Sequence, residues 1–473
     1  MADYAQDKEG FNLLAEENQD LKRQLKARHI TMISIGGAIG TGLFLGTGTS
    51  LQNGGPVGLL LGYVVIGTIC YTLMLCLGEM ISYLPIPGGH IKLAERFVNP
   101  ALSFAMGWNY WYSYAAAVLI DYWEHHKVND AAWITICLVV VICINMLGAG
   151  AYGEAEFFFV SFKVITITGL IILGIVLDLG GGPNHDRIGF RYWKHPGPFV
   201  QFNGISGAKG RFLGWWSVMT QAAFSYTGTE IVGIAAGEVK NPRRNLPRAI
   251  KRVYIRILLF YVGGAWIIGW FVPSNDPHLG LTSDAASSPF ASYLHYGLAI
   301  SGNAPKIFAR TSKSGLPYVS VIFCALFCSL AYMGVKSGSG KVFGWLANMS
   351  AIAGLMTWFG IAFTYVRFYA GLKAQGYDRS ELPFYSRLQP YAAWYVVVST
   401  VVVCFFSGFQ VFLKGGWNRA DFITNYLPLA LFPILYFGAR YLLYKNPMVD
   451  AADMNFVTGT VRDLNILERF WMD

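Results

Sequence analysis

Long apolar segments recur along the chain, and small and polar residues interrupt two of them in the middle. Such runs fit helices that cross a bilayer, which need about 20 mainly apolar residues each. Short segments of alternating hydrophobicity, which would indicate a membrane barrel, are too few. The pattern therefore predicts an all-α polytopic membrane protein with eleven spans, near residues 30–51, 57–84, 99–123, 132–150, 156–179, 212–236, 253–273, 316–335, 342–370, 391–413 and 426–444.

One large membrane domain is expected between two polar tails. Residues 1–28 are charged and lack an apolar stripe, so we expect a cytosolic N-terminal tail there. Residues 29–446 contain the spans, and residues 447–473 are expected to form a short cytosolic C-terminal tail. No cleavable signal peptide opens the chain, so the first span itself would direct membrane insertion.

Composition supports a membrane protein and narrows the classes of function. Charged residues make up only 13% of the chain, against roughly 25% in soluble domains. The net charge of +9 is expected from basic cytosolic loops, and no basic stripe beside exposed aromatics indicates nucleic-acid binding. The seven cysteines lie in apolar segments without metal-ligand spacing, so we expect free thiols, no metal and no cofactor. No constellation of nucleophile and base nominates an enzyme.

The two interrupted spans are the most informative part of the sequence. The first interruption reads Ile35-Gly-Gly-Ala-Ile-Gly-Thr-Gly42, and the second reads Phe224-Ser-Tyr-Thr-Gly-Thr-Glu230. Because backbone polar groups cannot stay unpaired in hydrocarbon, such breaks survive only where they line a protein cavity or bind something polar. The two spans are antiparallel and five spans apart, as in a transporter core of inverted five-helix repeats (5+5). This pairing predicts the substrate site of a transporter.

The chemistry of the two breaks suits a free amino acid. A half-helix that begins near Gly40–Gly42 presents N–H groups and a positive dipole end, which favour a carboxylate. The half-helix that ends near Phe224–Tyr226 presents carbonyl groups, which favour an ammonium group. The alternative is that the glycines are close helix-packing contacts. We predict substrate contacts at Gly36, Gly37, Gly40, Thr41, Gly42, Phe224, Ser225, Tyr226, Thr227 and Gly228.

Three ionisable residues within spans are further candidates, because charge inside a membrane is costly. Lys163 in the fifth span can lose its proton when desolvated, so it could couple transport to protons; the alternative is a side chain that reaches the interface. Glu230 follows the second break, where it could act as a gate or cap a helix, or be an ordinary hydrogen-bonded residue. Glu79 lies near a cytosolic end, and we expect a structural role.

The positions of basic residues in the loops agree with the number of spans up to the seventh span. After that span, the charges and the number of spans disagree. The loop with Arg243, Arg244 and Arg248 must be cytosolic, and the number of preceding spans agrees. Lys306 and Arg310 also favour the cytosol, although an odd number of spans precedes them. One span is therefore missing between the seventh span and residue 304, or the apolar run 289–300 enters the bilayer as a re-entrant segment.

Several motifs resemble the fungal amino acid permeases of the amino acid–polyamine–organocation superfamily. The resemblance covers nearly the whole chain and rests on the combination of motifs, since each motif alone is weak. The matching stretches are 22–48, Gly107-Trp-Asn-Tyr-Trp-Tyr112, Tyr152-Gly-Glu-Ala-Glu-Phe157, Ile188-Gly-Phe-Arg-Tyr-Trp193, Phe224–Glu230 and Ala236–Pro247.

The resemblance implies twelve helices around the inverted-repeat core and proton-coupled uptake of free amino acids at the plasma membrane. Gly40, Thr41 and Gly42 match the carboxylate-binding break of the family. Phe224, Ser225 and Tyr226 match its amine-binding break, and Lys163 matches its proton-linked lysine.

Two departures from the family pattern qualify that expectation. A short piece of the third helix is absent after Tyr114, and the whole eighth helix is absent because Phe290 runs directly into Ala291. The eighth helix is the span that the charge count finds missing, and it belongs to the second repeat. An impaired transporter and a non-transporting amino acid receptor or defective isoform therefore both stay open.

Overall fold

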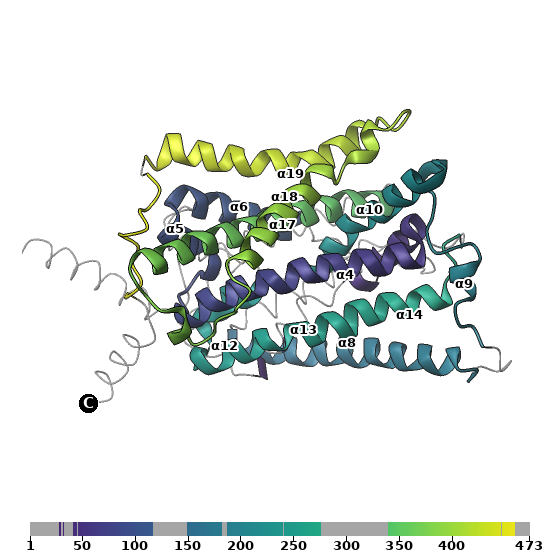
Figure 1. The fold of residues 1–473 in the computed structure, drawn as a ribbon, viewed down its shortest axis with the longest axis horizontal. Helices are drawn as coiled ribbons and strands as arrows, with labels where there is room; N and C mark the ends of the chain where they lie inside the picture. Colours follow the sequence, from purple (N-terminus) through teal and green to yellow (C-terminus); the bar gives the residue numbers. More distant parts are fainter. Residues whose placement is uncertain are drawn as a thin grey trace, which may run out of the picture.

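The computed structural model describes residues 28–29, 32, 41–44, 46–116, 149–181, 187–239, 241–275, 339–445 and 447–458. Within these ranges the regular elements are helices, and most of the long ones lie side by side along one direction (Figure 1). Five described helices are long and apolar enough to cross a membrane. This confirms an all-helical polytopic protein, while the predicted span 316–335 and residues 132–148 of the predicted span 132–150 lie outside the described residues.

The elements follow one another along the chain with these bounds: α3 Thr41–Phe44, α4 Gly46–Tyr83, α5 Gly89–Phe97, α6 Pro100–Ala116, α8 Ala149–Asp178, α9 Arg191–Lys194, α10 Gly207–Tyr226, α11 Ile231–Ala235, α12 Pro242–Lys251, α13 Val253–Arg256, α14 Gly263–Phe271, α17 Ser339–Ala374, α18 Tyr391–Phe406 and α19 Arg419–Gly438. A π-helical stretch, Ile257–Val262, joins α13 to α14, and another, Ala439–Leu443, follows α19.

Helix α4 runs through the middle of the molecule and contains the boundary between the first two predicted spans. The backbone leaves helical geometry at Gly55, whose φ is +75°, and Pro56 follows. A Cβ at Gly55 would lie 2.8 Å from the carbonyl oxygen of Pro198, so glycine is required both by φ and by space. Beyond this kink α4 packs along α10 and is buried for most of its length.

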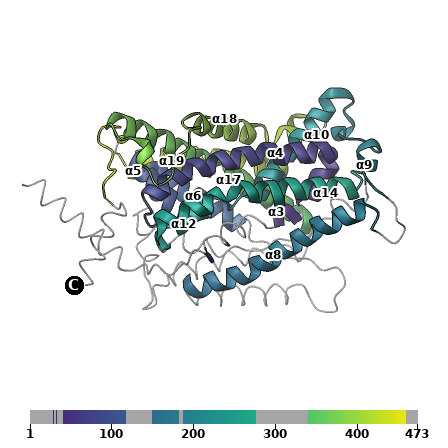
Figure 2. The ribbon, with the colours of Figure 1, turned by 60° about the horizontal axis from the view of Figure 1, so that its bottom comes forward.

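Basic elements gather at one end of the helices. Figure 1 places α5, α12 and the connection from α17 to α18 together at its left, and α9 at the opposite end. Helix α12 carries Arg243, Arg244 and Arg248, and α5 carries Lys92 and Arg96. The positive-inside rule makes this the cytosolic end. The turned view shows α8 at the edge of the bundle (Figure 2), and its side chains are largely exposed, as expected of a surface that faces lipid.

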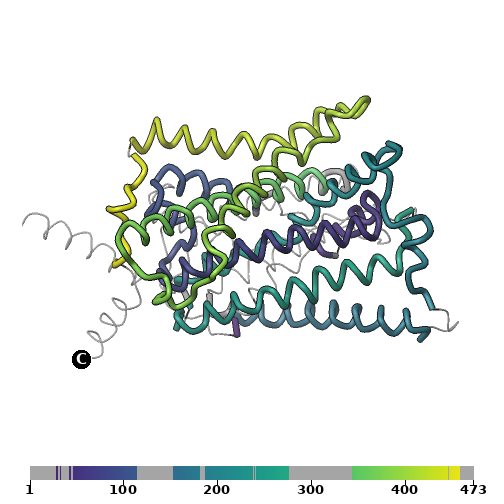
Figure 3. Tube along the Cα trace, in the orientation of Figure 1, coloured from purple at the N-terminus to yellow at the C-terminus, as the bar shows by residue number. Residues whose placement is uncertain are grey.

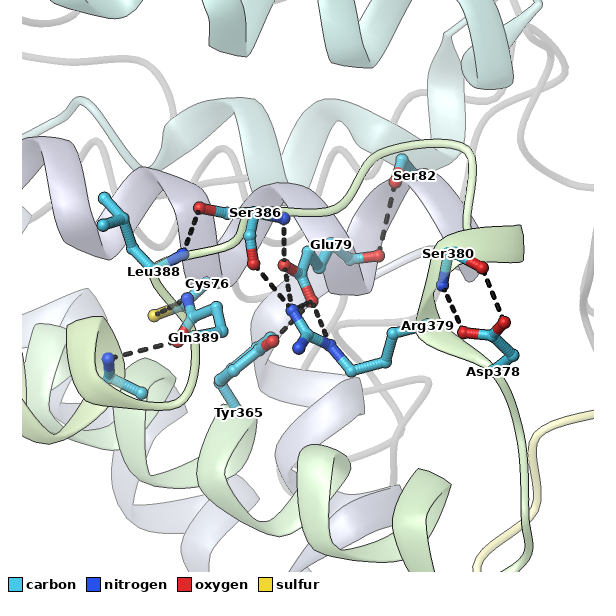
Figure 4. A network of polar contacts seen from close by, with 11 residues as sticks. Cys76, Glu79, Ser82, Tyr365, Asp378, Arg379, Ser380, Ser386, Leu388 and Gln389 are labelled. Atoms are coloured by element: carbon cyan, nitrogen blue, oxygen red, sulfur yellow. Dashed lines mark hydrogen bonds and ion pairs between the residues drawn. The ribbon is translucent and has the colours of Figure 1, made fainter.

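Glu79 anchors the α17–α18 connection onto the cytosolic end of α4 (Figure 4). The Glu79 carboxylate is fully buried and accepts hydrogen bonds from Arg379 Nη2, at 2.9 Å and 3.2 Å, from Ser386 N at 2.6 Å, and from the Tyr365 hydroxyl. A buried charge needs such a set of partners to offset its desolvation. The structural role expected for Glu79 therefore has a concrete form, the fixing of residues 379–386 against α4.

Residues 447–458, the described part of the predicted C-terminal tail, lie against the helices at the cytosolic end (Figure 3). Met454 and Phe456 of this segment are buried. The domain boundary at residue 446 stays a prediction, although the segment that follows it packs on the membrane domain.

Candidate substrate site at two broken helices

The two predicted breaks meet in space. The helical segment α3 begins at Thr41, and its Gly42 lies directly against the end of α10. A Cβ on Gly42 would lie only 2.5 Å from the Cα of Ser225 and 2.8 Å from its nitrogen. Glycine at position 42 therefore allows the backbone of α3 to touch the backbone of α10. Two breaks that face each other require such a contact.

The second break is formed by residues 227–230. Helix α10 ends at Tyr226, and α11 begins at Ile231. Gly228 has φ +97°, which favours glycine, and its N–H donates to Glu230 Oε1 at 3.2 Å. This hydrogen bond closes the turn within itself, while the Glu230 side chain makes no capping hydrogen bond to α11. The interruption predicted at Phe224–Glu230 is observed, and the gating or capping role of Glu230 stays a prediction.

Carbonyl groups at the end of α10 already have local partners. Thr227 N donates to the carbonyls of Ala223 and Phe224, and the Thr229 hydroxyl donates to the carbonyl of Tyr226 at 2.7 Å. The carbonyls of Ala223 and Tyr226 each already accept two hydrogen bonds, from the nitrogen and hydroxyl of Thr227 and from those of Thr229. An ammonium group bound at this helix end would therefore have to share these carbonyls with local donors.

Tyrosines from neighbouring helices hold the end of α10 in place. The Tyr63 hydroxyl of α4 lies 2.8 Å from Ser225 Oγ, and the Tyr226 hydroxyl donates to the carbonyl of Tyr63 at 3.0 Å. Tyr226 also stacks on Tyr261, with ring centroids 4.1 Å apart. Sequence analysis did not identify Tyr63 or Tyr261, since a tyrosine within an apolar span has no distinguishing local pattern.

The middle part of helix α17 lies along the second break. Asn348 Oδ1 accepts a hydrogen bond from Gln221 Nε2 at 3.3 Å, on the α10 side of the break. A Cβ at Gly354 would lie 3.0 Å from Thr227 Oγ1, so α17 touches the break itself. Trp358 Nε1 donates to Glu230 Oε2 at 3.1 Å on the α11 side. Sequence analysis missed this helix as a part of the site.

The opposite face of α17 is bonded to α6. Asn109 Nδ2 donates to the carbonyl of Ala353 at 2.7 Å and to Thr357 Oγ1 at 3.1 Å. Ser113 Oγ donates to the carbonyl of Ser350 at 2.8 Å. These buried polar contacts fix the position of α17 between α6 and the break, because each lost partner would leave a buried polar group unpaired.

Lys163 lies on α8 and is half-buried. Arg28 forms an ion pair with Glu154 of α8, and His29 Nε2 lies 3.1 Å from the same carboxylate. The guanidinium of Arg28 also lies over the ring of Phe157, 5.6 Å from its centroid. These contacts place the residues that precede the first break next to the helix that carries Lys163.

The remaining predicted positions are only partly covered by the structure. Gly36, Gly37 and Gly40 lie outside the described residues, and of Thr41 the structure describes the backbone alone. Among the residues that it does describe, no group of three histidine, cysteine or acidic side chains could hold a metal ion.

Comparison with known proteins gives the same family throughout the chain. The family model for amino acid permeases matches this chain in two segments, residues 29–296 and 291–449, which overlap at residues 291–296. The dicarboxylic amino acid permease of Saccharomyces cerevisiae is 40% identical over 492 aligned residues, covering 94% of this chain and 81% of that protein. A proline-specific permease of Emericella nidulans is 38% identical over 94% of this chain and 89% of its own length. The lysine-specific permease of Saccharomyces cerevisiae is 38% identical, over 96% and 83%.

Proposed function

Because this chain belongs to the amino acid permease family, we propose that it carries free amino acids across the plasma membrane together with protons. The observation that supports this function best is the contact of Gly42 with the backbone of Ser225, which joins the two broken helices. The helical segment that begins at Thr41 would receive the α-carboxylate through its N–H groups. The end of α10 at Phe224–Tyr226 would receive the α-amine through its carbonyl groups.

The proposed site recognises the two α-groups, and its test uses substrates in which one of them is blocked. Uptake of a radiolabelled amino acid is measured in cells that express the chain, with free, esterified and N-acetylated amino acids as competitors. Free amino acids should compete, whereas the blocked forms should not. Equal competition by blocked and free forms would contradict a site that needs both α-groups.

Proton coupling is proposed to depend on Lys163 of α8. A desolvated lysine loses its proton more readily, and Lys163 lies on the helix that the first span contacts through Arg28 and Glu154. In Lys163→Gln, acid-stimulated accumulation should be lost while exchange of amino acids persists. Lys209→Gln, which changes an exposed lysine of α10, is the matched control. A Lys163→Gln variant with full pH dependence would exclude this role.

A second candidate function is an amino acid receptor that does not transport. The family match is divided at residues 291–296, the point at which the sequence predicts a missing eighth helix. Binding and transport separate the two functions. A receptor would bind an unblocked amino acid in detergent, with loss of binding in Gly42→Ala, but would show no uptake above that of untransfected cells.

A further inference from the structure

The C-terminal segment 447–458 is bonded to three helices at the cytosolic end. Its backbone has no regular secondary structure, yet half of its twelve carbonyls have partners outside it. Gln375 Nε2 of the α17–α18 connection donates to the carbonyls of Ala451, Ala452 and Met454, at 3.2, 3.0 and 2.8 Å. The other contacts are Val449 N to the carbonyl of Val98 at 2.8 Å, Arg367 to the carbonyl of Val449, the Tyr83 hydroxyl to the carbonyl of Phe456 at 3.0 Å, and Arg96 to the carbonyl of Thr458 at 2.6 Å.

Phe456 is the apolar anchor of this segment. Its side chain is 1% exposed and stacks on Phe97 of α5, with ring centroids 5.3 Å apart. It also contacts Phe368 of α17 at 5.5 Å and Tyr377 at 5.4 Å. Gly371 makes room for it, because a Cβ at Gly371 would lie 2.9 Å from Phe456 Cζ. The segment thus occupies a socket formed by α5 and α17 together.

The two helices that the segment joins also hold the second break. A Cβ at Gly89 of α5 would lie 2.0 Å from the carbonyl oxygen of Gly233, so α5 is pressed against α11. Helix α17 contacts the break through Gly354 and bonds Glu230 through Trp358. A tie between α5 and α17 therefore restrains the two helices that contact α11 and the turn before it.

We propose that residues 447–458 form a strap that keeps the cytosolic side of the transporter closed. With Phe456 in its socket, α5 and α17 stay together around α11. Release of Phe456 frees these ends, so that α11 can separate and the site can open to the cytosol. The expected effect on uptake rests on the proposed transport function. The position of the strap and its effect on access from the cytosol do not.

The first test measures access to the cytosolic end of α11 and needs no substrate. A cysteine replaces the buried Ala236 in a chain otherwise free of cysteines, and a membrane-impermeant maleimide labels it in inside-out vesicles. Phe456→Ala should raise the labelling rate roughly tenfold, because the rate follows the fraction of molecules that are open to the cytosol and that fraction should rise by about the same factor. Val457→Ala, which changes the adjacent side chain that is 61% exposed, should leave the rate unchanged.

The second test locks the strap instead of releasing it, so it does not depend on folding of Phe456→Ala. Val98→Cys and Val449→Cys place thiols at two adjacent residues, since the Val449 N–H donates to the carbonyl of Val98 at 2.8 Å. Oxidation should abolish labelling at position 236 and stop uptake, and a reducing agent should restore both.

Three results separate the proposals. Equal labelling in Phe456→Ala and Val457→Ala, or unchanged labelling and uptake in the oxidised lock, would overturn the strap. If the reduced lock and the parent chain carry no amino acid, the transport function fails, and the labelling rates alone decide the strap. Uptake that stops on oxidation and returns on reduction supports both.

Discussion

Three buried ionisable residues at or near the cytosolic half of the molecule have very different partners. Glu79 is paired with Arg379 and receives two further hydrogen bonds. Glu230 accepts N–H groups from Gly228 and Trp358. His90 of α5 lies with its ring edge-on to Tyr110, 5.2 Å between centroids, and neither of its ring nitrogens has a hydrogen-bond partner within the described part of the chain. These environments lead to different predictions for substitution.

Removal of the Glu79 charge is expected to destabilise the protein strongly. Glu79→Gln leaves the Arg379 guanidinium, 20% exposed, without its carboxylate, and loss of one member of a buried pair costs about 3–5 kcal/mol. The apparent melting temperature of the purified protein in detergent measures the effect. Glu95→Gln, which breaks the partly exposed Lys92–Glu95 pair on α5, should cost at most about 1 kcal/mol. Equal losses in both variants would contradict the structural role of Glu79.

Acid is expected to weaken the fold through His90. Burial lowers the pKa of His90 from 6.5 to about 3, so the folded state binds fewer protons than the unfolded state between these values. Stability is then lost as the pH falls below 6.5, by about 2 kcal/mol at pH 5. The melting temperature of the parent chain should therefore fall more steeply from pH 7 to pH 5 than that of His90→Gln. Parallel falls in the two proteins would show that another group is responsible.

At the scale of elements, the second break is a property of three helices and not of one. The turn between α10 and α11 contains a hydrogen bond from Gly228 N to Glu230, Tyr63 of α4 holds the end of α10, and α17 contacts the turn through Trp358. Polar contacts from α6 hold α17 in that position. The backbone of Gly42 also approaches that of Ser225 so closely that an added methyl group would not fit.

Gly42 provides the sharpest test of this close packing. Gly42→Ala would place a Cβ 2.5 Å from the Cα of Ser225, and a backbone atom cannot give way as a flexible side chain can. We expect a loss of about 1–3 kcal/mol in stability and loss of amino acid binding. The matched control is Gly169→Ala on α8, where nothing lies within 4 Å of the added Cβ and helix propensity favours alanine. A Gly42→Ala variant that binds amino acids like the parent chain would contradict a substrate site at the contact of the two breaks.

At the scale of the whole molecule, the cytosolic end is held by two connections from different parts of the chain. Glu79 fixes the segment between α17 and α18, and Gln375 of that segment in turn bonds the strap 447–458. Residues 276–338, where the charge count fails and the eighth helix is predicted to be missing, lie outside the described residues.

Insertion of a family-like eighth helix between Phe290 and Ala291 should restore the agreement between charge and span count. Lys306, Arg310 and Lys313 would then face the cytosol after an even number of spans, and the second repeat would regain a packing partner. Surface expression and cysteine accessibility at Ser312 and in the C-terminal tail are measured with and without the insert. Cytosolic accessibility at both sites, together with normal surface expression and transport without the insert, would contradict the missing helix.

The sequence by itself determined the class of the protein, the spans that coincide with described helices and the existence of the second break. These features can be read locally, because a bilayer accepts only long apolar helices and a break within one must be built from small and polar residues. The end of α10 at Tyr226 and the beginning of α11 at Ile231 agree with the interruption predicted at Phe224–Glu230.

Only the tertiary structure decided which side chains complete those breaks. Trp358 reaches Glu230 over 128 residues of sequence, and Arg379 reaches Glu79 over 300. Phe456 enters its socket only because α5 and α17 lie side by side there. Such partners are set by how distant helices pack, and a tryptophan, an arginine or a phenylalanine near a helix end looks the same in sequence whether it has a buried partner or faces lipid or water.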